Sequence, residues 1–571
     1  MVQTKPPMNL DQPRLDILAT SGHLLIIGGP GCGKTTIALL KAREVVPALK
    51  PEQSVLFLSF SRAAVRQITD RMAGVLNRQT RRRLEVRTFH AFFMDIVRSH
   101  GRLQTGKSSS FITPDQEQQM QAAFEGDWAA ETRRLAADGK YVFDLLACTA
   151  ADLFERYPIL AALYGDAYPV VIVDEFQDTN DDQWRAIRAL SATSTILCLA
   201  DPDQRIYDHL PGVNEERIQH AIDTLQPKSF DLSKDNHRSP GQGLLAYANA
   251  VLRNDPSIPV PDNLTYATYN YRKVEVLAHQ YLIALRQHLR KELGREPTIA
   301  VLAPTNSLVG RLSEAAATEI EIDGTPYPAV DHELNLDQDL ASASAYVVAS
   351  IMEWPGVDPD VALTATVELI CNFYRVKSTK TPGAKAKVAV LERALADIAA
   401  GAKVRSGTVK AIAAACSDGI QFTGSPVQDW QLARARLSGS NELKEIFGKA
   451  RLIRLLKATD AIAWALTDAW NGTTYLDAAA VVRRVLANRM IEAIPSEEAA
   501  TTTFMNMYKS KGKEFDGVVI AETRFGNDQL IDHTSKEDDI QSRRRLLRVA
   551  ITRARHHVVI IRHASQPPLI G

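Results

Sequence analysis

The feature that most constrains the fold of this chain is a glycine-rich turn placed directly behind a short apolar run. Leu24 to Ile27 are apolar, Gly28-Gly-Pro-Gly-Cys-Gly-Lys-Thr35 follows them, and Thr36 to Ala42 is compatible with a helix. The segment fits the pattern G-x-x-x-x-G-K-[ST] in the strand-turn-helix context that the pattern needs. In such a turn the backbone amides lie at a helix N-terminus, where they bind phosphate. The chain is therefore predicted to contain an α/β core that binds a nucleoside triphosphate.

The residue types of the turn suit this chemistry position by position. Lys34 would reach the β- and γ-phosphates as a point charge, and the Thr35 hydroxyl would complete the coordination of Mg²⁺. The glycines allow the backbone to approach the phosphates closely. The residues predicted to bind the nucleotide phosphates are Gly28, Gly29, Pro30, Gly31, Cys32, Gly33, Lys34, Thr35 and Thr36.

A second motif offers a metal-binding carboxylate and a candidate base, which a phosphate-binding turn lacks by itself. Asp174-Glu-Phe-Gln-Asp-Thr179 follows the apolar run Val170 to Val173. Asp174 would end a buried strand, where a metal-binding carboxylate belongs, and Glu175 is the candidate base for the attacking water. The alternative for this segment is an acidic turn after a core strand. With both motifs present, we expect a chain that hydrolyses nucleoside triphosphate with Mg²⁺.

The size and composition of the chain limit its class. A chain of 571 residues and 63.0 kDa is too long for one core and suggests three or four domains. Lys plus Arg and Asp plus Glu balance at 67 each, so any grip on nucleic acid must come from local grooves and not from net charge. The five cysteines form no C-x-x-C pair, which argues against a disulfide framework, a zinc ribbon or an iron–sulfur cluster. No signal segment or membrane-length apolar run occurs, so we expect a soluble, cytoplasmic protein that does not enter a membrane.

Strand and helix patterns divide the chain into two α/β cores. Strands are clearest at 24–27, 55–58, 170–173 and 196–199, and strand signals return at 299–302, 518–520 and 558–561. Between them, strand signals vanish over about 111–162, and an alanine-rich, helix-patterned stretch runs from about 337 to 494, with a looped segment at 379–387. The predicted domains are a first core (1–103 and 161–233) with a helical insertion (104–160), and a second core (234–336 and 496–571) with another helical insertion (337–495).

Three further segments do not establish a function when each is taken alone. Asp201-Pro-Asp-Gln-Arg-Ile-Tyr207 follows a strand, so the Gln204 amide could sense a γ-phosphate at the carboxyl edge of the sheet; an ordinary polar turn is the alternative. Asn236-His-Arg-Ser239 and the basic segment 543–555 offer arginines that could stabilise charge on the transferring phosphoryl group. For the second of these, a solvated basic helix is the alternative.

Taken in order, these segments resemble the motifs of the UvrD/Rep/PcrA-type superfamily 1A DNA helicases from end to end. The D-E-F-Q-D-T form in particular separates that family from other P-loop enzymes such as GTPases or kinases. Beyond the two nucleotide motifs, the matching segments are Asn9 to Gln12 (Q motif), Ser59 to Ala64 (Ia), Thr88 to Phe93 (Ib), Asp201 to Tyr207 (III), Asn236 to Ser239 (IV), Tyr508 to Phe515 (V) and Arg544 to Ala554 (VI). The resemblance implies two RecA-like parallel-sheet P-loop domains, each interrupted by a helical insertion.

The resemblance also implies roles for individual residues. Gln12 would read adenine and Glu514 would bind the ribose, while Gln204, Arg238 and Arg553 would contact the γ-phosphate. The two arginines would come from the second core, so the catalytic site would be complete only when the cores close on ATP. Aromatic side chains along a groove would stack on bases of single-stranded or partly duplex DNA. The implied DNA-binding residues are Phe60, Arg62, Thr88, His90, Tyr207, His209 and Tyr508.

These roles together imply an ATP-dependent helicase or translocase that is stimulated by single-stranded DNA and moves 3′ to 5′, in DNA repair, recombination or replication. Several positions depart from the family pattern: His237 stands where a Tyr stacks on adenine, and His209, Tyr508 and Arg548 replace residues along the expected DNA-facing line. The sequence also stops soon after motif VI, so we expect no fused nuclease. The alternative is an ATP-switched, helicase-like subunit of a nuclease complex, such as a bacterial antiphage defence system, with weak or no unwinding alone; an RNA-directed enzyme is a third reading.

Overall fold

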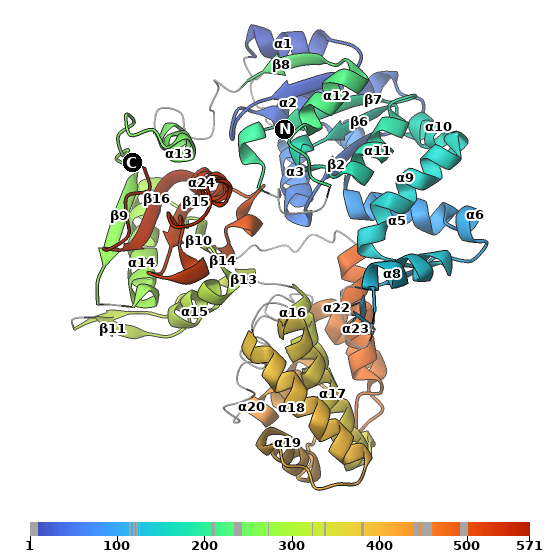
Figure 1. Ribbon diagram of the computed structural model, residues 1–571, viewed down its shortest axis with the longest axis vertical. Coiled ribbons are helices and arrows are strands. Elements are labelled where there is room, and N and C mark those ends of the chain that lie inside the picture. Colours follow the sequence, from blue (N-terminus) through green and yellow to red (C-terminus); the bar gives the residue numbers. More distant parts are fainter. Residues whose placement is uncertain are drawn as a thin grey trace, which may run out of the picture.

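The structure is a computed structural model of the 571-residue chain. It describes residues 10–113, 116–117, 120–121, 124, 126–206, 212–232, 243–271, 273–322, 324–335, 338–378, 382–438, 443, 446, 459–491 and 501–570. Two parallel sheets with their helices lie beside each other in Figure 1, and a separate bundle of helices lies below them. The predicted α/β class with parallel sheets is therefore confirmed.

The first sheet has six parallel strands in the order β3-β2-β6-β7-β1-β8. Its central strands are short apolar runs because both faces are covered, and buried parallel strands cannot alternate polar and apolar residues. Apolar clusters fill both faces. The strands are β1 (Leu24–Ile27), β2 (Val55–Ser59), β3 (Leu84–Thr88), β6 (Val170–Val173), β7 (Thr195–Ala200) and β8 (Lys228–Asp231).

Helices cover both faces of this sheet, and several begin at side-chain caps that the sequence encodes. Asn180 and Gln183 form a reciprocal capping box at the start of α11, and Thr88 caps α5. The helices of this region are α1 (Gln12–Ala19), α2 (Lys34–Val45), α3 (Arg62–Val75), α4 (Arg78–Arg81), α5 (Phe89–His100), α9 (Leu146–Arg156), α10 (Pro158–Ala167), α11 (Asp181–Leu190) and α12 (Arg217–Leu225), with 3₁₀ turns η1 (Val46–Ala48), η3 (Phe176–Asp178) and η4 (Pro202–Gln204).

The sequence predicted a first insertion without strands, but the structure has a short pair of strands there. Besides α6 (Arg102–Thr105), α8 (Trp128–Ala137) and η2 (Phe143–Leu145), it holds the parallel pair β4 (Ser110–Ile112) and β5 (Lys140–Val142). Each strand has three residues and carries Ser or Lys at its start, so neither produced a recognisable apolar run. The pair closes over a small cluster of Ile112, Leu135 and Val142.

The second sheet also has six parallel strands, in the order β13-β14-β10-β15-β16-β9. Apolar clusters again cover both faces. The strands are β9 (Leu264–Tyr269), β10 (Ile299–Ala303), β13 (Glu333–Asn335), β14 (Thr502–Asn506), β15 (Phe515–Ala521) and β16 (Ala554–His563). The elements around them are α13 (Leu244–Arg253), α14 (Val274–Leu293), α15 (Asn306–Ala316), the hairpin β11 (Ile320–Ile322) and β12 (Thr325–Tyr327), η7 (Tyr508–Ser510), η8 (Gly526–Asp528) and α24 (Glu537–Ile551).

The helical bundle interrupts the second core between β13 and β14 (Figure 1). It has its own apolar cluster. The looped segment expected at 379–387 is wrong from Pro382 onward, because α18 begins there: proline suits the first turn of a helix, and the following alanines and lysines favour helix. The elements are α16 (Gln338–Glu353), η5 (Trp354–Gly356), α17 (Pro359–Ser378), α18 (Pro382–Ala399), α19 (Gly407–Ser417), α20 (Pro426–Ser438), α22 (Thr459–Ala469) and α23 (Ala478–Ile491).

The described residues contain neither a membrane-spanning helix nor a metal-binding cluster of side chains. No helix within them combines the length and hydropathy needed to cross a bilayer. No group of three or more His, Cys, Asp or Glu side chains within them is arranged to hold a metal ion. The domain boundaries and the cytoplasmic location stay predictions.

Candidate functional site

The strand order of the first sheet brings the nucleotide motifs to one place. β7 lies between β1 and β6, with Ile27 beside Ala200 and Val173 beside Cys198. The segments that leave the carboxyl ends of these three strands are therefore neighbours: the turn after Ile27, Asp174 after β6 and Asp201 after β7. Open α/β sheets bind their ligands at this edge.

The glycine-rich turn has the geometry of a phosphate cradle. Gly31 and Gly33 have φ values of 81° and 94°, which only glycine adopts readily. A Cβ on Gly28 would stand 2.5 Å from the Cys32 sulfur, so no larger residue fits there. Gly33 provides no side-chain cap to α2, and the Lys34 amine donates to the carbonyl oxygens of Gly28 (2.5 Å) and Gly29 (3.2 Å) inside the turn. A helix N-terminus, a lysine and a close-approach turn together fit the phosphates of a nucleotide.

Asp174 and Glu175 differ in their electrostatic surroundings. Desolvation, followed by the charge of Glu175, raises the pKa of Asp174 to about 7. Desolvation also disfavours charge on Glu175, but the cations of Lys511 and Lys34 outweigh it and lower its pKa. Glu175 is therefore the carboxylate that stays ionised at neutral pH, as a base must. Its backbone lies in the left-handed region at φ 52°, a strained conformation of the kind that gathers at functional sites.

Two residues predicted to face the γ-phosphate meet across the cores. Arg553, which is 2% exposed, donates from Nη2 to Oε1 of Gln204 at 3.1 Å. The other end of the Gln204 amide donates to Oδ2 of Asp201 at 2.6 Å. Arg553 precedes β16 in the second core and Gln204 follows β7 in the first, so the contact joins segments that lie 349 residues apart.

These groups line a cavity of about 330 Å³ between the two cores. Lys34, Asp174 and Glu175 line it from the first core, and Glu514 and Arg553 from the second. The complete lining is Gly29, Pro30, Gly31, Gly33, Lys34, Thr35, Thr36, Ala64, Gln67, Ile68, Arg71, Asp174, Glu175, Gln204, Gly512, Glu514, Arg553 and Arg555. Twelve residues predicted to bind the nucleotide, to hold the metal or to catalyse hydrolysis therefore line one cavity, and they come from both cores.

 

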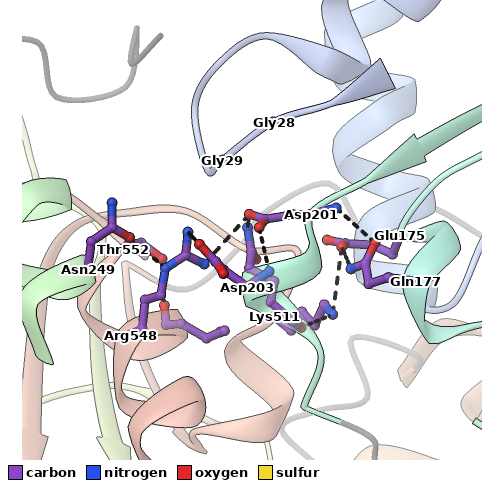
Figure 2. Close-up of polar contacts among 12 residues, drawn as sticks. Gly28, Gly29, Glu175, Gln177, Asp201, Asp203, Asn249, Lys511, Arg548 and Thr552 are labelled. Atoms are coloured by element: carbon purple, nitrogen blue, oxygen red, sulfur yellow. Dashed lines mark hydrogen bonds and ion pairs between the residues drawn. The ribbon is translucent and has the colours of Figure 1, made fainter. Parts of the chain in front are cut away.

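A lysine from the second core lies beside Glu175, one of the residues that line this cavity. The amine of Lys511 donates to the Gln204 carbonyl oxygen at 2.6 Å, pairs with the Asp178 carboxylate, and lies 3.6 Å from Oε2 of Glu175 (Figure 2). The side chains of Lys511 and Asp178 are 6% and 1% exposed. A buried charge needs a partner, so this lysine and these acids hold the two cores together.

Sequence reasoning missed several residues around Glu514. This carboxylate pairs with Arg71 on α3, from the first core, and accepts from Nη2 of Arg555 at 3.0 Å. Arg71, Arg555 and Gln67 all line the cavity. No local signal could have identified Arg71, because its partner lies 443 residues away in the chain.

Arg548 does not lie along a DNA-facing line, where the sequence had placed it. Its side chain is 2% exposed and points at the first core, with Nη1 3.6 Å from Asp201 and Nη2 3.5 Å from Asp203 (Figure 2). The reason is its register on α24: this position faces the turn after β7, and two carboxylates there attract a buried cation.

Other predicted nucleotide residues lie away from the cavity or outside the described part. Gln12 is exposed and donates to Asp16 at 2.8 Å, and its adenine-reading role stays a prediction. Gly28 and Cys32 belong to the turn but do not line the cavity. Arg238 and the rest of motif IV lie outside the described residues.

Three candidate DNA-binding residues, Phe60, Thr88 and His90, lie together beside β2 and β3 at one edge of the first sheet. The pairing of Ser59 with Thr88 sets Phe60 beside the start of α5, where its ring lies 5.0 Å from that of Phe89. His90 is exposed and follows on the same helix. Tyr508 leaves β14 in the second core and is partly exposed. The side chain of Arg62, together with Tyr207 and His209, lies outside what the structure describes, so the groove stays a prediction.

Two protein-family models match this chain, one in each core. Residues 15–209 match the family model described as an AAA domain, and residues 502–561 match the UvrD-like helicase C-terminal domain. The chain is 26% identical over 292 residues to the ATP-dependent DNA helicase PcrA of Leuconostoc citreum, a match that covers 43% of this chain and 39% of the relative. It is 26% identical over 247 residues to the putative ATP-dependent DNA helicase YjcD of Bacillus subtilis strain 168, covering 35% of this chain and 32% of the relative.

A longer match spans both cores and the helical bundle. Against the ATP-dependent DNA helicase PcrA of Staphylococcus aureus strain Mu50 the chain is 23% identical over 645 residues, covering 99% of this chain and 84% of the relative. The chain thus spans less than half of the first two relatives and most of the third. One model matches the core with the phosphate-binding turn, another matches the core with Arg553, and the likeness to PcrA runs through both. The chain is similar to the UvrD/PcrA-type helicases through both cores.

Proposed function

We propose that this chain is an ATP-dependent DNA helicase or translocase that single-stranded DNA stimulates and that moves 3′ to 5′. The observation that carries the proposal is the contact of Arg553 with Gln204 on the wall of a cavity that also exposes Lys34 and Glu175. A phosphate-binding turn and a base come from one core, and an arginine comes from the other. Hydrolysis that needs both cores can therefore be coupled to their motion.

The residues of the cavity suit phosphoryl transfer to water. Lys34 would bind the β- and γ-phosphates, and Glu175, ionised at neutral pH, would accept a proton from the attacking water. Arg553 would stabilise the charge that develops on the γ-phosphoryl oxygens. Thr35 and Asp174 would hold Mg²⁺, which neutralises phosphate charge when bound. The cavity lining includes carboxylate, hydroxyl and cationic groups, which are the groups that this chemistry needs.

The DNA strand would cross the ends of both sheets. Phe60 and Tyr508 are partly exposed aromatic side chains that can stack on bases of any sequence, and His90 is exposed beside Phe60. Because the net charge is balanced, cationic contacts with the DNA backbone would have to come from local grooves. The names of the relatives, each an ATP-dependent or putative ATP-dependent DNA helicase, support DNA as the substrate.

The decisive experiment is steady-state ATP hydrolysis by the purified chain, with and without an oligothymidine strand. We expect DNA to raise the rate and Glu175→Gln to lower it by at least about a hundredfold, since general-base catalysis contributes about that much. Glu52→Gln is the matched control, because Glu52 is an exposed glutamate of the same core. Full hydrolysis by Glu175→Gln would contradict the assigned base, and a rate indifferent to DNA would contradict a DNA-driven motor.

Strand displacement tests direction and separates the alternative. Duplexes with a 3′ or a 5′ single-stranded tail should differ, with the 3′-tailed duplex unwound faster. Equal or reversed preference would contradict 3′-to-5′ movement. The nuclease-complex alternative would be favoured if the lone chain hydrolysed ATP without displacing a strand, and if displacement appeared when a co-purified nuclease was present.

A further inference from the structure

A buried arginine outside the assigned catalytic set contacts the first core beside the cavity. Arg548 lies on α24 and is 2% exposed. Its Nε donates to Oδ1 of Asn249 on α13 at 2.8 Å, which fixes the plane of the guanidinium. The two remaining nitrogens then face the turn after β7, one toward Asp201 at 3.6 Å and one toward Asp203 at 3.5 Å.

Asp201 is the centre of a hydrogen-bond network that reaches the base. Its Oδ2 accepts from Nε2 of Gln204 at 2.6 Å, and its backbone amide donates to Oε1 of Gln177 at 2.9 Å. Nε2 of Gln177 in turn donates to Oε2 of Glu175 at 2.7 Å (Figure 2). Asp201 therefore contacts two glutamines, Gln177, whose amide contacts Glu175, and Gln204, whose amide contacts Arg553.

The charge balance at Asp201 depends on the second core. Asp201 is 2% exposed, and a carboxylate that is buried without a cation is expensive. Arg548 is the cation that approaches it from across the cores, and Nη2 of Arg548 also lies 4.0 Å from the position that a Cβ on Gly29 would take. One guanidinium thus lies against α13, the turn after β7 and the phosphate-binding turn.

We propose that Arg548 is a positioning residue for ATP hydrolysis, which holds Asp201 and through it orients Gln177 and Gln204 around Glu175. The inference rests on the proposed function, because it presupposes hydrolysis at this cavity. Arginine suits the role better than lysine: its rigid fork serves three partners at once, whereas an ammonium is a point charge on a flexible stem. The ion pairs form only when the two cores are together, so the base is in place only in the closed arrangement.

The test compares three variants for ATP hydrolysis at saturating single-stranded DNA. Arg548→Met keeps the length of the side chain and removes the charge; we expect kcat to fall at least about tenfold, with the KM for ATP within about threefold of wild type. Arg548→Lys restores the charge without the fork and should recover part of the loss. Arg543→Met is the matched control, because Arg543 lies on the same helix, is partly exposed and joins neither ion pair.

A double-mutant cycle tests whether Arg548 acts through Asp201. If Arg548 acts through Asp201, Arg548→Met combined with Asp201→Asn should lose less in kcat than the product of the two single losses. Thermal melting of every variant separates loss of fold from loss of positioning, and Arg548→Lys keeps the test informative should Arg548→Met melt early.

The outcomes distinguish this inference from the proposed function. No hydrolysis by the wild-type chain, with or without DNA, would sink the proposed function. Wild-type hydrolysis with an unchanged kcat in Arg548→Met would overturn the inference alone. A raised KM with unchanged kcat, equal losses in Arg543→Met, or strictly multiplicative effects in the cycle would also overturn it.

Discussion

The strongest prediction concerns the buried pair of Lys511 and Asp178, which joins the two cores beside Glu175. Their side chains are 6% and 1% exposed, and Glu175 lies 3.6 Å from the lysine amine. Removing one partner of a buried pair costs about 3–5 kcal/mol, because the other charge stays buried. Lys511→Met would leave two acids, Asp178 and Glu175, without their shared cation.

That cost falls on the closed arrangement of the cores, where the pair forms. If it appears in full in catalysis, kcat/KM for ATP in Lys511→Met should fall by about two to three and a half powers of ten, at about 1.4 kcal/mol per tenfold. Asp178→Asn should lose activity too. The double variant should recover part of the combined loss, with a coupling energy of about 2 kcal/mol, because neither charge is then stranded.

The assay is steady-state ATP hydrolysis at saturating single-stranded DNA for wild type, the two single variants and the double variant. Lys536→Met is the control, because Lys536 is an exposed lysine of the second core. Melting curves identify any variant that fails to fold. A coupling energy below about 0.5 kcal/mol, which is within the error of additivity, would refute the reasoning.

Three further predictions concern the phosphate cradle, the partly buried Lys513 and the predicted DNA-binding residue Phe60. Gly28→Ala should weaken ATP binding at least about tenfold by titration with a fluorescent nucleotide, because its Cβ would meet the Cys32 sulfur at 2.5 Å and displace the turn; unchanged affinity would contradict this. Desolvation lowers the pKa of Lys513 to about 8 from 10.5, so its charge opposes folding below pH 8 and the penalty fades as pH rises toward 10.5; Lys513→Met should gain at most about 3 kcal/mol at pH 7 and lose that advantage in melts at high pH. Phe60→Ala should raise the DNA concentration for half-maximal stimulation at least about fivefold, since stacking is worth about 1–3 kcal/mol per base, and an unchanged value would exclude Phe60 from the groove.

The strands that the sequence predicted are those buried on both faces. β1, β2, β6 and β7 are central or near-central in the first sheet and read as continuous apolar runs, as do β10, β15 and β16 in the second. The strands without such a signal are mostly at the edges: β8 begins with Lys and Ser and is largely exposed, and β3 and β9 alternate polar and apolar residues. β14 is buried, but its two threonines interrupt the apolar run. A strand that is buried on both faces must be apolar throughout, so it can be recognised in the sequence. An edge strand is not under this constraint and gives no such signal.

Part of the candidate site could be predicted from local motifs, and the rest depends on contacts between residues that lie far apart in the sequence. The turn around Lys34 and the acids after β6 could be predicted because each motif carries its chemistry within a few residues. The strand order then brings them together, and a parallel sheet makes that outcome expected. The pairs of Arg71 with Glu514 and of Lys511 with Asp178 link residues 443 and 333 positions apart, and no local pattern specifies such partners.

The orientation of the two sheets explains why the second core contributes through turns that precede strands. Asp174 and Asp201 follow β6 and β7, at the carboxyl edge of the first sheet, whereas Glu514 and Arg553 directly precede β15 and β16, at the amino edge of the second. The amide of Phe515 donates to the carbonyl oxygen of Arg553, which fixes these two turns against each other. A movement of the second sheet therefore shifts both residues as one unit relative to the phosphate-binding turn. Opening the cores would withdraw the arginine and the predicted ribose ligand together, so hydrolysis and nucleotide affinity should fall in step when closure is impaired.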